Sequence, residues 1–287
     1  MPPENLKIYR IITHITYFVN KEETVLKKEY SRFADSTVFE GIVSLRALIN
    51  VMTDENRRND RRITKVLYDR ERAEKEKKEL SWLYHRAEEV GFEIELSDRS
   101  IIDNISVGNT HGGILAFCTD RSFLTPNDEN ISENGFYVML DGVEDPYNFG
   151  YALRSLYAAG ADGVILGKRN WMSAAGVVCR ASAGASELID IYVADDPENA
   201  VKYIKSRGYS VVCADIENSV PLYECPLSRP ILTVIGGEKR GISRSILSLS
   251  DSIVRIDYGR TFGASLSAAS AATVVGFEVL RQSMGKK

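Results

Sequence analysis

From Phe136 onward, six short apolar runs alternate with stretches of helical periodicity, and this alternation constrains the fold more than any other feature of the sequence. The apolar runs cover residues 136–140, 163–166, 188–193, 209–214, 231–235 and 252–256. The helical stretches cover about 148–160, 174–183, 197–206, 243–249 and 264–283. A helix after each strand returns the chain so that the next strand runs in the same direction. The sequence therefore predicts an α/β fold with a parallel sheet that helices cover on both faces.

Three of the predicted strands run into loops that are rich in glycine and polar residues. After Asp141 the chain reads Gly-Val-Glu-Asp-Pro-Tyr-Asn-Phe-Gly, and Arg154 lies one turn into the helix that follows. The second loop, 235–243, carries three glycines that allow a tight backbone course, and the third, 256–270, leads into a helix of small residues. Ligands of open parallel sheets bind outside the carboxyl ends of the strands. We therefore expect the three loops to share one edge of the sheet and to form the ligand site.

The first part of the chain predicts a smaller α/β domain over residues 39–118. An apolar helical run begins after Phe39, and a strand-like segment, a long charged helix over about 70–90 and two further strands follow. The segment 119–135 is rich in Asn, Asp, Ser and Pro, which is typical of an interdomain linker. Residues 136–287 form the second domain, and residues 1–38 remain unassigned.

The charge of the chain limits the partners that it can bind. A formal net charge of −4 argues against indiscriminate binding of polyanions but leaves room for a local basic face. Such a face is predicted between residues 57 and 78, where ten Lys or Arg residues outnumber five acidic ones. Any attraction for a nucleic acid is therefore expected from the first domain.

The same composition excludes several other classes of protein. No apolar run approaches the roughly 20 residues that span a bilayer, and the start of the chain lacks the apolar core of a secretion signal, so we expect a cytoplasmic protein with no membrane contact. The four cysteines lie far apart, with no Cys-x-x-Cys pair and no histidine at ligand spacing. Buried thiols are therefore expected, without a disulfide framework and without a metal site.

The motifs in these loops resemble those of the SpoU-type (TrmH-like) RNA ribose 2′-O-methyltransferases of the SPOUT superfamily. They are Asp145-Pro-x-Asn148-x-Gly150-x-x-x-Arg154, Gly236-Gly237-Glu238-x-x-Gly241, and Ser265-Leu266 at the start of an alanine-rich last helix. In the first domain, the segments 38–41 and 111–116 look like the edges of the RNA-recognising amino-terminal module of many members. The resemblance covers roughly residues 39–283.

This resemblance implies a carboxyl-terminal trefoil knot, a homodimer that forms through the knot region, and S-adenosylmethionine as cofactor. Members of the family grip the cofactor largely with the backbone of the second and third loops. The matching positions in this chain are Ala214, Ile235, Gly236, Gly237, Ile256, Ser265 and Leu266. No Gly-x-Gly-x-x-Gly follows a predicted strand, so the fingerprint of a Rossmann dehydrogenase or methyltransferase is absent from the sequence.

The implied reaction is attack of a ribose 2′-hydroxyl oxygen on a sulfonium methyl group, which requires alignment and loss of the hydroxyl proton. The resemblance assigns Arg154 to assist that deprotonation, Asn148 to orient the arginine or the substrate, and Glu238 to hold the loop amides and Arg154 in register. Because arginine stays protonated in proteins, Arg154 is alternatively a ligand for the adjacent phosphate or the developing alkoxide. Ser267 stands where the family usually has asparagine, and Asp257 where it usually has proline.

Ribosomal RNA is the predicted substrate. Its phosphates are expected to contact the start of the basic run, at Arg57, Arg58, Arg61, Arg62 and Lys65, although a solvated charged surface explains the same residues. Transfer RNA is the alternative substrate. A catalytically weakened RNA-binding or ribosome-assembly protein is the alternative function, because Ser267 and Asp257 depart from the family pattern. A nucleotide-binding oxidoreductase, the third possibility, lacks its glycine fingerprint.

Overall fold

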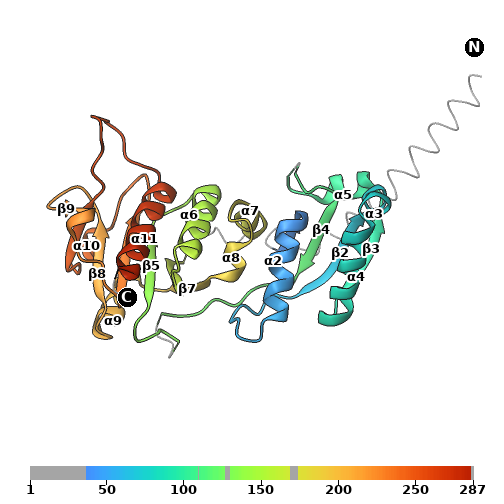
Figure 1. The fold of residues 1–287 in the computed structure, drawn as a ribbon, viewed down its shortest axis with the longest axis horizontal. Coiled ribbons are helices and arrows are strands. Elements are labelled where there is room, and N and C mark those ends of the chain that lie inside the picture. Colours follow the sequence, from blue (N-terminus) through green and yellow to red (C-terminus); the bar gives the residue numbers. More distant parts are fainter. Residues whose placement is uncertain (1–36, 109, 127–129, 169–173, 286–287) are drawn as a thin grey trace, which may run out of the picture.

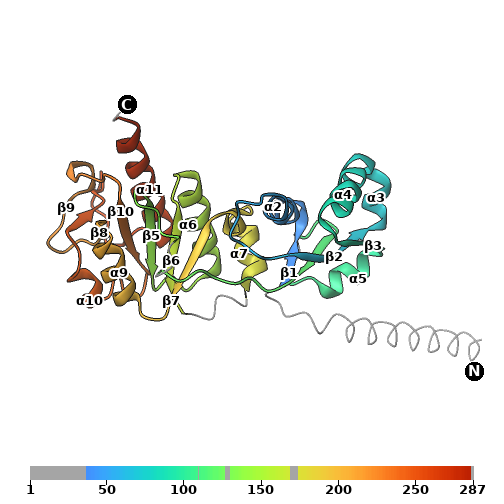
Figure 2. The ribbon, with the colours of Figure 1, turned by 90° about the horizontal axis from the view of Figure 1, so that it is seen from below.

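The computed structural model describes residues 37–108, 110–126, 130–168 and 174–285. Most of the unassigned segment 1–38 therefore lies outside the described residues. The chain forms two sheets that follow one another along the long axis of the molecule, with helices α7 (Ala175–Ala181) and α2 (Gly41–Thr53) between them (Figures 1 and 2).

The first sheet has four strands in the order β1-β4-β2-β3. Its strands are β1 (Val38–Glu40), β2 (Ile63–Asp69), β3 (Glu93–Ser97) and β4 (Ile114–Cys118). Its further helices are α3 (Arg70–Lys75), α4 (Lys77–Val90) and α5 (Arg99–Ile105). One long helix over 70–90 was expected, and this prediction is wrong because Glu76 leaves the helical conformation, with φ −108° and ψ 50°. Gly91 ends α4 in the left-handed conformation, where its amide donates to the Ala87 carbonyl oxygen.

The second sheet has seven strands in the order β7-β6-β5-β10-β8-β11-β9, and every neighbouring pair is parallel. The strands are β5 (Phe136–Asp141), β6 (Gly163–Gly167), β7 (Asp190–Ala194), β8 (Ser210–Ala214), β9 (Val220–Pro221), β10 (Ile231–Gly236) and β11 (Ser252–Arg255). All six predicted strands are confirmed, and so is the parallel sheet. The seventh strand, β9, was not predicted because its two residues are too short to give an apolar run.

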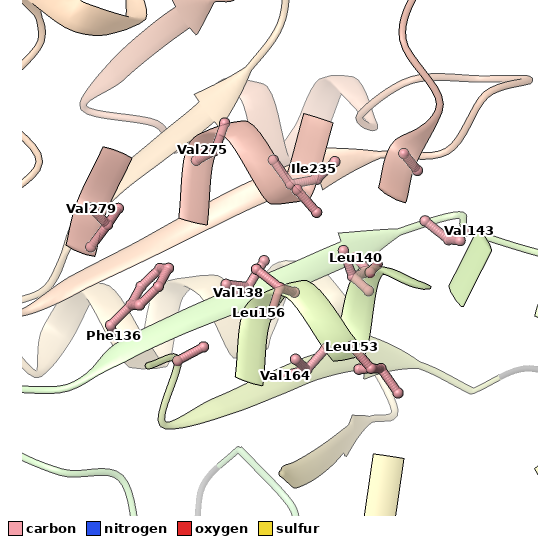
Figure 3. Close-up of a cluster of buried hydrophobic side chains, with 14 of the residues drawn as sticks. Phe136, Val138, Leu140, Val143, Leu153, Leu156, Val164, Ile235, Val275 and Val279 are labelled. Carbon is pink, nitrogen blue, oxygen red and sulfur yellow. The ribbon is translucent and has the colours of Figure 1, made fainter. Parts of the chain in front are cut away.

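Helices pack on both faces of this sheet. They are α6 (Pro146–Ala158), α7, α8 (Ala185–Leu188), α9 (Pro197–Ser206), α10 (Arg244–Leu247) and α11 (Ala268–Met284), with a short 3₁₀ turn, η3 (Leu222–Glu224). Strand β5 contributes to the cores on both faces of the sheet, because alternate residues of a strand point to opposite faces. Phe136, Val138 and Leu140 join the core beneath α6 and α11 (Figure 3), whereas Tyr137 and Met139 join the core beneath α9 and α10.

In the segment 119–135, predicted as a linker, residues 121–124 lie against the edge of the second sheet. Leu124 makes a parallel bridge to Tyr192 of β7, with backbone hydrogen bonds to Ile191 and Val193. Arg121 is buried, and its guanidinium donates to the carbonyl oxygens of Ser186 and Ile189. The chain between the two sheets is thus held in place by both backbone and side-chain contacts.

The four cysteines are free and buried, as the sequence predicts. Burial raises the pKa of the Cys179 and Cys213 thiols to about 12, so both are protonated at neutral pH. Within the described residues, no group of three or more His, Cys, Asp or Glu side chains is placed to hold a metal ion. The described helices include none that is both long and apolar enough to cross a bilayer.

Candidate active site

The loops that the sequence singles out begin at one edge of the second sheet, which we call the carboxyl edge. Asp141 at the end of β5 pairs with Gly236 at the end of β10. Ile235, one residue earlier, pairs with Ala214, which ends β8, and Ala214 pairs in turn with Val254 of β11. Parallel strands in this register deliver their carboxyl ends, and the loops after them, to the same place. The expected convergence of the three loops is therefore present.

The first two loops touch through their backbones. The Gly237 amide donates to the Asp141 carbonyl oxygen at 2.7 Å, and the Asp141 carboxylate accepts from the Ser243 amide at 2.9 Å. A Cβ atom on Gly237 would lie 2.1 Å from the Gly142 carbonyl oxygen. Only glycine permits this approach, which explains why the Gly-Gly pair lies at this point of the second loop.

Glu238 connects the second loop to the helices that follow the other two. Its Oε1 atom accepts from Asn148 Nδ2 at 2.9 Å and from the Ala268 amide, at the start of α11, at 3.1 Å. Asn148 does not cap α6, because Asp145 does so by accepting from the Asn148 amide at 2.7 Å. One carboxylate therefore sets the position of both helix starts.

The third loop closes on itself before it reaches α11. The Leu266 amide donates to the Tyr258 hydroxyl at 3.0 Å, and Ser267 caps α11 by accepting from the Ser270 amide at 3.2 Å. The cap explains why α11 begins at Ala268 rather than near residue 264. Asp257 forms an ion pair with Arg255 at 2.7 Å instead of entering the site. Sequence reasoning missed Tyr258, because no motif marks a tyrosine whose partner is a backbone amide eight residues away.

The predicted cofactor contacts fit a ligand held largely by the backbone. Ile235 and Gly237 are buried, but Ala214, Gly236, Ile256 and Leu266 are only half-buried, and Ser265 is exposed. The strand residues just before Ala214 and Gly236 are buried, so exposure begins where each strand leaves the sheet. These small and apolar residues offer peptide groups and an apolar surface at the carboxyl edge, as an adenosine with an amino acid chain requires.

Arg154 lies on α6, two turns from its start, with an exposed side chain. Among the residues that the structure describes, it has no hydrogen-bond or ion-pair partner, so pairing with Glu144 or Asp145 does not explain its presence. Helix α6 itself is fixed beside α11, where the Thr273 hydroxyl donates to the Ser155 hydroxyl at 2.7 Å. A fixed helix thus carries the Arg154 guanidinium one turn beyond Gly150, where no described residue pairs with it.

The SpoU rRNA Methylase family model matches residues 135–277. A putative TrmH family tRNA/rRNA methyltransferase of Staphylococcus saprophyticus is 31% identical over 189 residues, which are 64% of this chain and 75% of that protein. The chain belongs to the SpoU rRNA methylase family. The 23S rRNA (guanosine-2′-O-)-methyltransferase RlmB of Photorhabdus laumondii is 28% identical over 275 residues, 94% of this chain and 99% of its own.

Two solved structures share the fold of this chain. The AdoMet-bound rRNA methyltransferase from Sinorhizobium meliloti superposes with a TM-score of 0.69 at 22% identity, over 92% of this chain and 94% of that one. The SpoU methyltransferase AviRb from Streptomyces viridochromogenes superposes with a TM-score of 0.70 at 19% identity, over 88% of this chain and 91% of that one. Both superpositions include the first sheet as well as the second, because their coverage exceeds the length of either domain.

In this SpoU family member, the start of the basic run lies away from the site. Arg57 donates to the Leu188 carbonyl oxygen and to the Tyr157 hydroxyl, and Arg58 pairs with Asp190, the first residue of β7, at 3.2 Å. These partners lie at the amino ends of the strands. The loop between α2 and β2 accordingly lies at the bottom of Figure 1, opposite the loop between β11 and α11.

The prediction that this run contacts RNA needs correction at Arg61. Its side chain is 4% exposed and pairs with Glu187 at 3.2 Å, beside Asn59, which donates to the same carboxylate. A buried guanidinium committed to a carboxylate is not available to a phosphate. Lys65 pairs with Glu95, whereas Arg62 is exposed. Charge density along the sequence did not reveal that these arginines join the two sheets.

Proposed function

We propose that this SpoU family member transfers the methyl group of S-adenosylmethionine to a ribose 2′-hydroxyl of RNA, with ribosomal RNA as its substrate and the cytoplasm as its location. The observation that carries the proposal is the double contact of Glu238, which brings the starts of α6 and α11 together at the carboxyl edge. Arg154 on α6 is exposed and has no partner among the described residues. The 23S rRNA (guanosine-2′-O-)-methyltransferases among its relatives support the choice of substrate.

The cofactor supplies a methyl group that its positively charged sulfur already activates. The protein must therefore align the hydroxyl oxygen with that methyl and assist loss of the hydroxyl proton. The backbone around Gly236, Gly237 and Leu266 holds the cofactor at the carboxyl edge. Arg154 binds the phosphate next to the target ribose and stabilises the developing alkoxide, because a guanidinium offers several donors and keeps its charge.

Asn148 and Ser267 complete the alignment. Asn148 Nδ2 is committed to Glu238, which leaves its Oδ1 atom to accept a hydrogen bond from Arg154 or from the ribose. The Ser267 hydroxyl, which caps α11, occupies the position of the usual asparagine. We also propose that the chain between β10 and α11 forms the trefoil knot of the family, which the contact of Ala268 with Glu238 supports.

A direct assay tests the proposed function. The full chain is incubated with methyl-labelled S-adenosylmethionine and either ribosomal or transfer RNA, and the product is mapped for 2′-O-methyl groups. Label is expected at one ribose of ribosomal RNA, and that mark should be missing from cells that lack the protein. Label on a base, or no transfer together with no cofactor binding in calorimetry, would contradict the proposal.

We propose that the protein is a homodimer that covers the outer surfaces of α6 and α11. These neighbouring helices carry large exposed apolar side chains: Tyr147 and Tyr151 on α6, 47% and 50% exposed, and Phe277 and Met284 on α11, 45% and 65% exposed. Apolar side chains that gather on a surface typically mark an interface.

Phe277→Glu is therefore expected to weaken the dimer by about tenfold or more, because it places a charge where the proposed interface would bury an aromatic side chain. Sedimentation velocity over a range of concentrations measures the shift. Tyr84→Glu is the matched control, since Tyr84 is 44% exposed but lies on α4 of the first sheet. A wild-type protein that sediments only as a monomer would refute the homodimer.

A further inference from the structure

Helix α7 packs against the backbone of β1 in the first sheet and against helix α6, which covers the second sheet. A Cβ atom on Gly176 would lie 2.2 Å from the Val38 carbonyl oxygen of β1, so α7 packs directly on the first sheet. On its other side, a Cβ atom on Gly150 would lie 2.6 Å from Ala181 Cβ and 2.9 Å from the Val178 carbonyl oxygen. Gly150 belongs to α6, one turn before Arg154. The same short helix therefore contacts the first sheet and the helix that carries the proposed catalytic arginine.

An ion pair joins α7 to the end of β1, and hydrogen bonds connect the same two side chains to a loop of the first sheet. Glu40, at the end of β1, is buried, and its Oε1 atom accepts from the Val107 and Gly108 amides at 2.7 and 2.8 Å. Its Oε2 atom accepts from Arg180 of α7 at 2.5 Å, and Arg180 also donates to the Thr110 hydroxyl at 3.0 Å. Both amides and the hydroxyl belong to Val107, Gly108 and Thr110, which are described residues of the loop between α5 and β4.

This loop lies on the side of the molecule where the proposed chemistry occurs. In Figure 1 it stands at the top of β4, on the same side as the loop between β11 and α11. A continuous set of contacts thus leads from the loop through Glu40 and Arg180 to α7, and from α7 through Gly150 to Arg154. Removal of one partner from such a pair leaves a buried charge uncompensated, so the pair resists separation.

We propose that Glu40 and Arg180 are positioning residues that fix the loop between α5 and β4 relative to Arg154. An RNA held against that loop then presents one particular ribose to the methyl donor. The inference rests on the proposed function. Because a misplacement of about 1 Å can cost about 10²-fold in rate, a link of this kind determines both speed and choice of nucleotide.

Arg180→Met tests the proposal, with Arg229→Met as the matched control. Each arginine has a side chain that is 28% exposed, and each forms one ion pair with a carboxylate. Arg229 pairs with Asp162, at the opposite edge of the second sheet. Arg180→Met is expected to lower kcat/KM for RNA by about tenfold and to spread 2′-O-methyl groups to neighbouring riboses. The dissociation constant for S-adenosylmethionine should not change, and Arg180→Lys should restore much of the selectivity.

Hydrogen exchange tests the same link without catalysis. Glu40→Gln should increase amide exchange both at Val107 and Gly108 and in the first half of α6. Increased exchange confined to the loop, or methylation that stays at the original ribose in Arg180→Met as it does in Arg229→Met, would overturn the proposal. A wild-type protein that transfers no methyl group to ribose would refute the proposed function instead, while the exchange experiment would still decide whether the link exists.

Discussion

Arg154→Ala is expected to lower kcat for RNA methylation by about 10²- to 10³-fold, the loss typical of removing one donor that stabilises developing negative charge. The cofactor affinity should stay the same, because none of the proposed cofactor contacts involves α6. The free energy of unfolding should also stay within about 0.5 kcal/mol of the wild-type value, since Arg154 is exposed and has no partner among the described residues. Single-turnover transfer of labelled methyl groups, calorimetry and thermal unfolding measure these three quantities.

Arg207→Ala serves as the control, because Arg207 is also exposed but lies at the end of α9, at the opposite edge of the second sheet. Arg154→Lys tests whether the arginine acts through its positive charge alone or also through its several hydrogen-bond donors. Lysine keeps the charge but loses the fork of donors that binds a phosphate at two points. Activity near the wild-type level in Arg154→Lys would mean that charge alone suffices, and full activity in Arg154→Ala would refute the catalytic assignment.

Gly237→Ala is expected to abolish measurable cofactor binding and to destabilise the fold by about 1–3 kcal/mol, as overpacking does. The added methyl group would lie 2.1 Å from the Gly142 carbonyl oxygen and 2.5 Å from its carbon, and both atoms are backbone. The first two loops would have to separate, which breaks the hydrogen bond from the Gly237 amide to Asp141. Calorimetric titration with S-adenosylmethionine and thermal unfolding measure the two effects.

Gly263→Ala is the matched control for this change. Gly263 belongs to the third loop, and a Cβ atom there would meet no atom within 4 Å. This variant should bind the cofactor like the wild type. Normal cofactor affinity in Gly237→Ala would contradict the assignment of the second loop as a binding loop.

The sequence predicts the second sheet well because its strands are buried on both faces. Each long strand is a nearly continuous apolar run, and the glycine and polar residues that follow it mark the carboxyl edge. β9 escaped prediction because its backbone pairs with β11 over only two residues. The break in the helix at Glu76 was not predicted either. Arg72 pairs with Glu79 across the break, and the apolar pattern of the sequence does not indicate an ion pair.

The contacts within the candidate site were less predictable than its location. The motif spacing named Glu238 and Asn148, but the sequence does not contain the information that one oxygen atom serves both Asn148 and Ala268. The prediction that Arg61 contacts RNA was wrong for a related reason. Arg61 looks like its exposed neighbour Arg62 in the sequence, yet Asn59 and Glu187 enclose it, and Glu187 lies 126 residues away.

The contacts that assemble the site also determine when it can exist during synthesis. Asn148 lies 90 residues from Glu238, and Asp141 lies 102 residues from Ser243. A nascent chain that ends before Ala268 contains Arg154 and the first two loops, but it does not yet contain the start of α11, which Glu238 holds. Contacts of such long range form late in folding. The contact between Glu238 and the start of α11 can therefore form only after the chain has been synthesised beyond Ala268.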